Sequence, residues 1–302
     1  MSKVVIAGCG FTGLATARLF AGAGWEVVGV THSAESAAAL GAEKFRVVTC
    51  DITDRAALAA RGELHGAEAV IHCASSGRGG VEQYRAVYLG GVQALGELLA
   101  PGLLVFTSST SVYAQTDGGW VTESSAAEPD RETGRVLRET EEWVVARNGL
   151  VARLAGIYGP GRSVLLRKFF AGEAVIEGDG GKWINQAHRD DIAAALVHLV
   201  TAQARGIFNV SDDEPLTQRA VYEWLARRFA RPVPPGGPID MNRKRGWTNK
   251  RVSNAKLRAS GWVARYPSFF TAVENDAGLL AEFSSSLEGK LTASPPATAT
   301  PP

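Results

Sequence analysis

The chain has 302 residues, and 45% of them are hydrophobic, which is enough to bury a large core. Its 32 Lys and Arg residues nearly balance its 31 Asp and Glu residues, so the charge gives no reason to expect nucleic acid as a partner. The chain has three cysteines and no CxxC pair, which argues against a disulfide framework. It has no His/Asp/Glu set with the spacing of a metal site and no apolar run long enough to cross a membrane. We therefore expect a cytoplasmic protein.

Short apolar runs alternate with helical patterns through the first half of the chain. The predicted strands are Lys3–Ala7, Glu26–Thr31, Phe45–Cys50, Ala69–Ala74, Leu103–Ser108 and Leu150–Leu154, and the predicted helices are Gly13–Ala23, Ser33–Leu40, Asp54–Arg61, Glu82–Leu99 and Glu132–Arg147. Most of these strands are continuous apolar runs, which is typical of strands buried on both faces. The six repeats therefore predict an α/β fold with a doubly wound parallel sheet, the Rossmann fold.

The regular alternation weakens after Tyr158-Gly159-Pro160-Gly161, although a helix over Asp191–Thr201 and a seventh strand over Gly206–Val210 are still expected. We assign residues 1–160 and 190–212 to the dinucleotide-binding domain, and residues 161–189 and 213–282 to a smaller substrate-binding lobe. Residues 283–302 are rich in Ser, Ala, Thr and Pro, so we predict a disordered tail.

A glycine loop, Gly8-Cys9-Gly10-Phe11-Thr12-Gly13, joins the first strand to the first helix with the spacing GxGxxG. Gly8 allows a tight turn, Gly10 lets the backbone approach a diphosphate, and Gly13 lets the helix pack on the strand. The backbone N–H groups at the start of this helix, Phe11 and Thr12 included, then face the phosphates. The alternative is an ordinary glycine-rich turn, but the position between strand and helix favours a dinucleotide site.

The end of the second strand carries Thr31-His32-Ser33, and the nearest acidic residue is Glu35. NAD-binding proteins usually place Asp or Glu there to hold the ribose hydroxyls, and a carboxylate would repel the 2′-phosphate of NADP. The sequence therefore favours NADP over NAD, although the absence of an Arg at this point leaves NAD open. The alternative is that the three residues form only a polar loop and a helix cap.

Further motifs follow in an order that resembles the extended short-chain dehydrogenase/reductase family, the NAD(P)-dependent epimerase/dehydratase-like proteins, over roughly residues 3–280. The matching segments are Asp51-Ile52 (adenine recognition), Ala74-Ser75 (cofactor loop), Phe106–Tyr113 (catalytic serine), Arg153–Gly161 (nicotinamide loop), His188–Asp191 and Gly206–Val210. By this resemblance Ser109 polarises a substrate carbonyl. Arg153, Ala155, Gly156 and Ile157 lie beside the cofactor, and the helices Glu82–Leu99 and Glu132–Arg147 pair in a homodimer.

The sequence departs from this family at its catalytic centre. The family's Tyr-x-x-x-Lys is absent: Thr133 occupies the tyrosine position and Leu137 the lysine position, and Tyr88 stands where many members have Asn. Thr cannot transfer a proton near neutral pH as a tuned phenol does, and Leu has no charge. Tyr113 and Tyr158 are phenols near the expected nicotinamide end, so either could replace the tyrosine; the alternative is that both only pack. The loop glycines differ too, since Ala7 replaces the first glycine of GxxGxxG.

Three residues are candidates for substrate contact. The resemblance implies that Arg251 faces a nucleotide-sugar phosphate, which guanidinium groups bind well, and places Tyr158 and Arg162 on the substrate side. A solvated basic face is the alternative for Arg251, because Arg243, Lys244 and Arg245 lie nearby. No metal site is expected, and His72 within an apolar strand is interpreted as a core histidine.

Two functions remain open from the sequence. The first is an enzyme that moves a hydride between the nicotinamide ring and a carbonyl or alcohol carbon of a small polar substrate, such as a sugar nucleotide. The second is a catalytically silent NAD(P)-binding redox sensor or scaffold, which the loss of both Tyr and Lys predicts.

Overall fold

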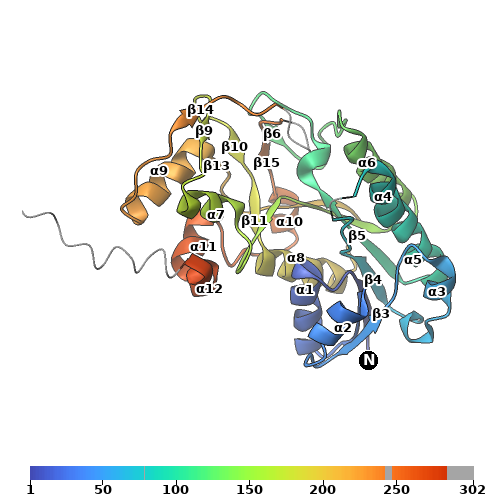
Figure 1. Cartoon of the computed structure of the whole chain (residues 1–302). Coiled ribbons are helices and arrows are strands. Elements are labelled where there is room, and N and C mark those ends of the chain that lie inside the picture. The colour runs from blue at the N-terminus through green and yellow to red at the C-terminus, as the bar shows by residue number, and fades with distance from the viewer. Residues whose placement is uncertain (78, 242–246, 284–302) are drawn as a thin grey trace, which may run out of the picture.

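A computed structural model describes residues 1–77, 79–241 and 247–283 (Figure 1). Residues 284–302 of the predicted tail lie outside the described residues, as do Arg243, Lys244 and Arg245. The prediction of a disordered tail is wrong for Phe283, its first residue, which is buried. The Phe283 ring stacks on Phe170 with the two centroids 4.6 Å apart.

Seven parallel strands form the central sheet, in the order β12-β7-β5-β4-β1-β2-β3. Their bounds are β1 Lys3–Ala7, β2 Glu26–Thr31, β3 Arg46–Thr49, β4 Ala69–His72, β5 Leu103–Ser109, β7 Leu150–Leu154 and β12 Gly206–Val210. The predicted doubly wound parallel sheet is confirmed. The chain reverses direction across the sheet between β1 and β4, and this switch point is where α/β folds leave a crevice for ligands.

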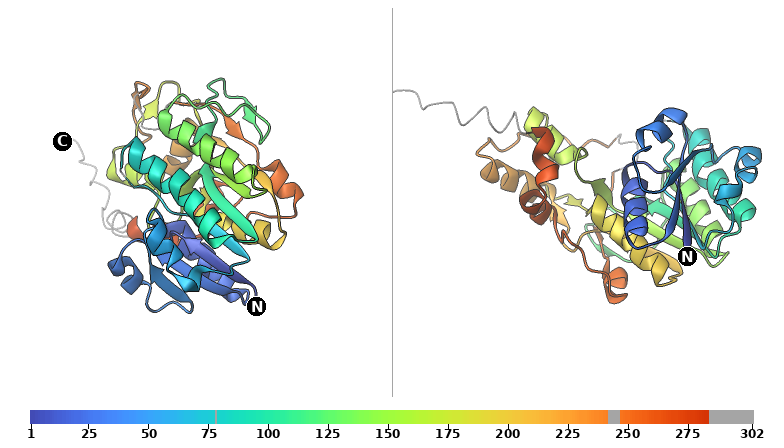
Figure 2. Two further views of the ribbon diagram at one scale, coloured as in Figure 1. Left: turned by 90° about the vertical axis from the view of Figure 1, so that its right-hand side faces the viewer. Right: turned by 90° about the horizontal axis from the view of Figure 1, so that it is seen from below.

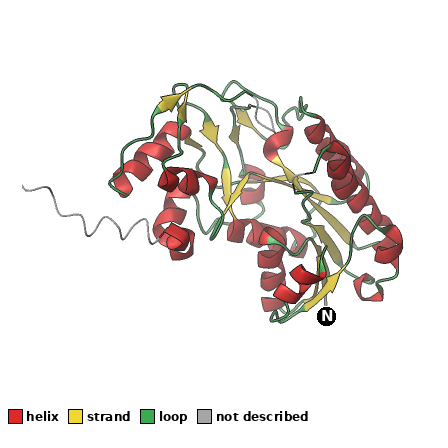
Figure 3. Ribbon diagram, in the orientation of Figure 1, coloured by secondary structure: helices red, strands yellow, loops and turns green. Residues whose placement is uncertain are grey.

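Helices cover both faces of this sheet (Figure 3). Helices α1 (Phe11–Gly22) and α8 (Arg189–Thr201) pack in one core cluster, and α3 (Arg55–Ala59), α5 (Gly91–Leu99) and α6 (Glu132–Val145) pack in the other. Alternate residues of β1 enter opposite clusters, Val4 and Ile6 one of them and Val5 and Ala7 the other. A strand with two buried faces needs apolar residues at every position, which explains the continuous apolar runs.

The predicted helix over Glu82–Leu99 is interrupted in the structure. It consists of α4 (Val81–Arg85), a π-helical turn η2 (Ala86–Gly90) and α5. A π-helical turn carries an extra residue and often lies at a functional site. The apolar spacing on either side of it is close to helical, so the sequence pattern alone does not reveal the interruption.

Most of the remaining elements form a smaller lobe beside the carboxyl ends of the strands, at the left of Figure 1 and again apart from the sheet in Figure 2. Its helices are α7 (Val164–Ala171), α9 (Gln218–Arg228), α11 (Phe269–Asn275) and α12 (Ala277–Leu280), which enclose a third cluster rich in aromatic residues. Short strand pairs complete it: β8 (Gly156–Tyr158) with β11 (Gln186–His188), β9 (Ile176–Glu177) with β14 (Gly236–Gly237), and β10 (Trp183–Ile184) with β13 (Leu216–Thr217).

One segment that we assigned to the lobe packs on the sheet domain instead. Strand β15 (Arg251–Val252) pairs with β6 (Trp120–Val121), and α10 (Ala255–Ala259) follows it. Leu257 and Trp262 join the core cluster of α1 and α8, because these large apolar side chains find their buried surface there. Within the described part of the chain, no helix combines the length and apolar character needed to cross a membrane.

Candidate functional site

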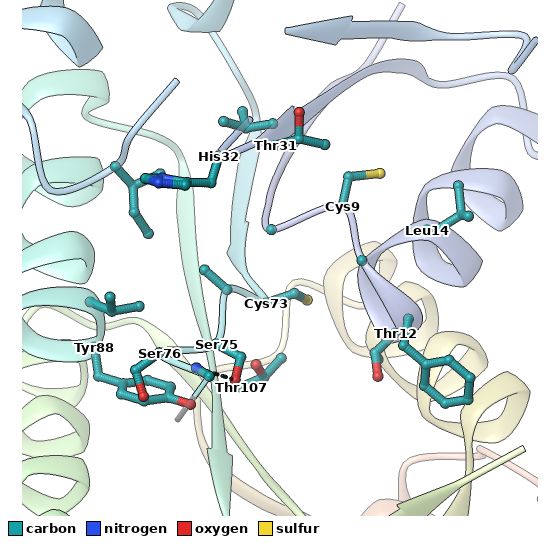
Figure 4. Close-up of a pocket in the computed structure, with 18 of the residues that line it drawn as sticks. Cys9, Thr12, Leu14, Thr31, His32, Cys73, Ser75, Ser76, Tyr88 and Thr107 are labelled. Carbon is teal, nitrogen blue, oxygen red and sulfur yellow. Dashed lines mark hydrogen bonds between the residues drawn. The ribbon is translucent and has the colours of Figure 1, made fainter. Parts of the chain in front are cut away.

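A cleft of about 860 Å³ lies at the carboxyl ends of the central strands, at the switch point of the sheet. The predicted site residues that line it are Gly8, Gly10, Phe11, Thr12, Thr31, His32, Asp51, Ile52, Ala74, Ser75, Ser109, Ala155, Ile157 and Arg162. Figure 4 shows the glycine loop, β2 and β4 contributing side chains from opposite sides. The size suits a dinucleotide-scale ligand, since ligand clefts commonly enclose about 300–1,000 Å³.

The glycine loop is built so that a ligand can approach its backbone. A Cβ on Gly8, whose φ is +97°, would lie 2.3 Å from the backbone nitrogen of Ala74, and one on Gly13 would lie 2.2 Å from Gly8 O. A Cβ on Gly10 would meet nothing within 4 Å, so the space beside Gly10 is open to the cleft. Gly10 is also the N-cap of α1 and offers no side-chain cap. The first N–H groups of α1 therefore fit a diphosphate, and Gly13 serves packing rather than lining the cleft.

Two guanidinium groups stand at the same helix start. The Cζ atoms of Arg162 and Arg189 each lie 5.2 Å from the ring centroid of Phe11, and both side chains line the cleft. Arg189 is paired with Asp190 at 2.8 Å, whereas Arg162 forms no ion pair with any described residue. The positive charge of Arg162 is thus available to an anionic group in the cleft.

One end of the cleft combines Asp51 with the polar end of β2. Burial acts to raise the pKa of Asp51, but hydrogen bonds from the backbone and hydroxyl of Thr53, together with nearby His32, hold it below its ordinary value. His32 Nδ1 lies 3.8 Å from Asp51 Oδ2, and the His32 side chain is 80% exposed. Ser33 caps α2 (Ala34–Ala39) by accepting from Ser36 N, and it does not line the cleft.

The opposite end of the cleft contains Ser109 and hydroxyls from neighbouring strands. Ser109 Oγ accepts from Ser111 N at 3.2 Å, and its own proton has no acceptor among the described residues. Thr107 Oγ1 donates to His72 O at 2.8 Å, and Ser75 Oγ accepts from Gly77 N at 3.3 Å. The Ser109 hydroxyl can therefore donate to an oxygen of a molecule in the cleft.

Helix α6 presents no proton-transfer group to this end. Leu137 lines the cleft, and Thr133 lines a smaller hollow of about 20 Å³ next to Trp247 and Thr248. The two residues thus reach neighbouring spaces from one helix, and neither carries an ionisable side chain.

Tyr113 and Arg153 lie outside the cleft, in a buried polar network. Arg153 forms two hydrogen bonds to Glu141, at 2.7 and 3.0 Å, and its Nη1 donates to the Tyr113 hydroxyl at 2.8 Å. Tyr113 lies 2.8 Å from Asn209 Oδ1, and burial raises its pKa. The resemblance implies that Arg153 contacts the cofactor, and the sequence offers Tyr113 as an acid–base group. In the structure neither side chain lines the cleft, because Glu141 holds the Arg153 guanidinium in the core and Arg153 in turn binds the Tyr113 hydroxyl.

Three further candidates also lie away from the cleft. The Tyr158 hydroxyl is buried and has no hydrogen-bond partner among the described residues. Its ring packs in the lobe cluster, and this burial raises its pKa. Gly156 pairs with Gln186 in the β8–β11 sheet. The Arg251 Cζ lies 5.0 Å from the ring centroids of both Trp120 and Trp183, and its Nε donates to Gly118 O. None of the three lines the cleft.

Other cleft residues were not assigned a role from the sequence. Tyr84 and Tyr88, from α4 and η2, both line the cleft. The family resemblance places Tyr88 at the catalytic centre only as a replacement for Asn. Its ring neighbours His72 and Phe106 come from two strands distant in sequence, and no local pattern specifies them. No group of three or more His, Cys, Asp or Glu side chains in the described ranges could hold a metal ion.

Comparison with known proteins decides the family. Residues 4–211 match the model of the NAD dependent epimerase/dehydratase family. Protein YeeZ of Escherichia coli strain K12 is 32% identical over 245 residues, which cover 75% of this chain and 84% of YeeZ. The chain belongs to the NAD dependent epimerase/dehydratase family.

Solved structures of this epimerase/dehydratase class share the fold. A Methylobacillus flagellatus structure described as an NAD-dependent epimerase/dehydratase is 29% identical, with a TM-score of 0.76 over 94% of this chain and 99% of that chain. Human SDR39U1 with NADPH is 19% identical, with a TM-score of 0.75 over 92% and 99% of the two chains. DesIV (dTDP-glucose 4,6-dehydratase) of Streptomyces venezuelae, with NAD and TYD bound, is 22% identical, with a TM-score of 0.76 over 96% and 99%.

Proposed function

We propose that the protein is an NAD(P)-dependent oxidoreductase or epimerase/dehydratase-like enzyme that acts by hydride transfer on a small polar substrate. The observation that carries this proposal is the cleft itself, in which the open backbone beside Gly10 and the Ser109 hydroxyl line one continuous space. The proton of that hydroxyl has no acceptor among the described residues. A diphosphate cradle and a carbonyl-polarising donor thus border one space, as the middle and the reacting end of a bound nicotinamide dinucleotide require.

Different residues of the cleft would contact different parts of a bound nicotinamide dinucleotide and its substrate. The N–H groups at the start of α1 hold the diphosphate, while Asp51 and Ile52 hold the adenine. The bound nicotinamide supplies or accepts the hydride. Ser109 donates a hydrogen bond to the reacting oxygen, which stabilises the negative charge that develops there.

The cofactor favoured by this cleft is NADP. His32 and Ser36 line the adenosine end, and β2 ends without an acidic side chain to repel a 2′-phosphate. Relatives of this fold have been solved with NADPH, as in human SDR39U1, and with NAD, as in DesIV. Among substrates, a sugar nucleotide suits the cleft, because Arg162 brings an unpaired positive charge to its wall.

A second function, cofactor binding without turnover, is favoured by one observation. Leu137 lines the cleft where the family resemblance places a lysine, and Thr133 takes the tyrosine position. A redox sensor or scaffold needs neither proton transfer nor a polarised carbonyl. The unpaired Ser109 proton favours the enzyme, since a silent protein has no use for a donor aimed at a substrate oxygen.

The experiment follows nicotinamide absorbance while a panel of carbonyl compounds and sugar nucleotides is mixed with the protein and NADPH or NADH. We expect turnover of at least one compound, with kcat about 100-fold lower in Ser109→Ala because a donor to the developing oxyanion is lost. Ser111→Ala is the control, since only the Ser111 backbone contacts Ser109. Tight cofactor binding with no turnover across the panel would instead support the sensor.

A further inference from the structure

The proposed hydride transfer needs a group that gives and takes a proton at the substrate oxygen, and α6 supplies none. Of the tyrosines in the sequence, four are buried away from the cleft: Tyr113, Tyr158, Tyr222 and Tyr266. Tyr84 and Tyr88 line the cleft from the interrupted helix α4–η2–α5. Among the tyrosines, only those of this helix can therefore reach a molecule bound in the cleft.

The π-helical turn η2 is held by a hydrogen bond from His72, a buried histidine of the underlying strand β4. His72 Nε2 lies 2.9 Å from Val87 O, and burial lowers the pKa of His72 to about 4, so the ring is neutral and its Nε2–H donates to this carbonyl. Val87 directly precedes Tyr88. The hydrogen bond thus satisfies a carbonyl inside the irregular turn and holds the adjacent residue in place.

Aromatic contacts set the direction of the Tyr88 ring. Its centroid lies 5.8 Å from His72, 6.1 Å from Phe106 and 4.4 Å from Tyr84. His72, the last residue of β4, is the register partner of Phe106 in the middle of β5. Thr107 and Ser109 continue β5 from that point, so Tyr88 lies over the Ser109 end of the cleft rather than the adenosine end. Figure 4 shows the Tyr88 ring on the same side of the cleft as Ser75, Ser76 and Thr107.

The Tyr88 hydroxyl is free to act on a bound molecule. The side chain is half-buried, and its hydroxyl forms no hydrogen bond with any described residue. By contrast, the Tyr113 hydroxyl is held by Arg153 and Asn209. A phenol that lines a ligand cleft without a protein partner has its proton available to the ligand.

We propose that Tyr88 is the catalytic acid–base residue of this cleft, in place of the tyrosine that is missing from α6. This inference rests on the proposed function. In the reductive direction, hydride from NAD(P)H adds to the substrate carbonyl carbon, the C=O π pair takes the proton of the Tyr88 hydroxyl, and the products are the alcohol, NAD(P)⁺ and a phenolate. Water returns a proton to the phenolate. In the oxidative direction the phenolate removes the alcohol proton as hydride leaves the carbon.

Among the described residues, the rings next to Tyr88 are Tyr84 on its own helix, the neutral His72 of β4 and the apolar Phe106 of β5. Helix α6 contributes Leu137 to the same cleft, and its Glu139 is paired with Arg85 of α4 on the surface. Arg162 and Arg189 line the same cleft. An oxidised nicotinamide ring beside Tyr88 would add a further positive charge, and a positive charge favours the phenolate.

The test is a titration of phenolate absorbance in the full-length protein, with and without NADP⁺. We expect one phenol to ionise at a pH lower by about one unit when NADP⁺ is bound, since an opposite charge within a few ångströms shifts a pKa by about 1–3 units. Tyr88→Phe should lose this cofactor-linked step while its NADP⁺ Kd changes by less than about twofold. Tyr84→Phe, the matched control one helical turn away, should keep the step.

The outcomes separate this inference from the proposed function. If wild type binds NADP⁺ and the step persists in Tyr88→Phe, or disappears only in Tyr84→Phe, Tyr88 is not the acid–base group although the cofactor site stands. If wild type binds neither NADP⁺ nor NAD⁺, the proposed function fails and the inference fails with it. With a carbonyl compound that wild type reduces, Tyr88→Phe should lower kcat by about 10²–10⁴-fold at unchanged KM.

Discussion

Arg153 and Arg162 are nine residues apart and carry the same charge, but their surroundings give them different roles. Arg153 is 1% exposed and forms an ion pair with Glu141, so its charge is compensated inside the protein and does not reach a ligand. Arg162 lines the cleft and has no acidic partner among the described residues. The same contrast separates Tyr113 from Tyr88. Partners and burial, rather than residue type, decide which polar side chains can act on a ligand.

The first prediction at this scale concerns His32. We expect His32→Asp to weaken NADPH binding at least about tenfold and to leave NADH binding unchanged or tighter, because the new carboxylate repels a 2′-phosphate and can hold ribose hydroxyls. Fluorescence titration of both reduced cofactors measures the ratio of the two Kd values. An unchanged ratio would mean that the end of β2 does not contact the 2′ position.

The second prediction concerns the buried pair of Glu141 and Arg153. Glu141→Ala leaves the Arg153 guanidinium buried without its partner, so we expect a loss of about 3–5 kcal/mol in the free energy of unfolding. Glu142→Ala removes an adjacent carboxylate that is 67% exposed and bound to Arg138, and should cost less than about 1 kcal/mol. Urea denaturation of both variants gives the comparison, and equal losses would contradict it.

Sequence reasoning located backbone features of the site better than its side chains. The glycine loop can be identified because it joins a strand to a helix at a fixed spacing, whereas Asp51 and Ser109 are implied by the resemblance of their segments to the family. All three lie at one edge of the sheet, because the carboxyl ends of parallel strands meet there. The positions of Arg153 and Tyr158 depended on partners distant in sequence, Glu141 and the lobe cluster. No local pattern specifies such partners, so these two were placed beside the cleft and lie in the interior.

At the scale of elements, the interrupted helix α4–η2–α5 is the feature that most affects the site. Its apolar spacing predicts one helix over Glu82–Leu99, and the extra residue of η2 shifts the register that places Tyr84 and Tyr88. The buried His72 that supports η2 comes from β4, which lies beneath. A contact between elements therefore determines the helix geometry, and the helix sequence alone does not contain it.

The third prediction follows from burial of His72. Its pKa is lowered from an ordinary 6.5 to about 4, so the unfolded chain binds a proton there in a pH range where the native protein does not. Stability from this group is present above pH 6.5 and is lost as the pH falls toward 4. Between pH 7 and 5, wild type should lose about 2 kcal/mol more unfolding free energy than His72→Gln, whose amide can still donate to Val87 O.

Urea denaturation of both proteins at the two pH values measures this difference. Buried carboxyl groups with raised pKa, such as Asp191 and Asp212, are common to wild type and variant and cancel in the comparison. Equal losses in the two proteins would contradict a neutral, buried His72.

At the scale of the whole molecule, the fold could be predicted almost entirely and the lobe only in outline. Seven strand runs and their intervening helices specify a parallel sheet, because strands buried on both faces need apolar residues throughout. The lobe is held by aromatic contacts among short elements, such as Phe169 with Tyr222, which have no periodic signal. The segment with Leu257 and Trp262 also has no periodic signal, and both side chains pack in the core cluster of α1 and α8 rather than in the lobe. The expected homodimer through α4–α6 stays a prediction.

The most direct test of the account compares two glycines of α1 and its N-cap by titration calorimetry. Neither Gly10 nor Gly22 has an atom within 4 Å of an added Cβ, so both alanine variants should fold. Only Gly10 borders the cleft. We expect wild type and Gly22→Ala to bind NADPH or NADH with one site per chain, and Gly10→Ala to bind at least about tenfold more weakly because the methyl group occupies the diphosphate position. Equal binding by Gly10→Ala, or no binding by wild type, would contradict the proposed cofactor site.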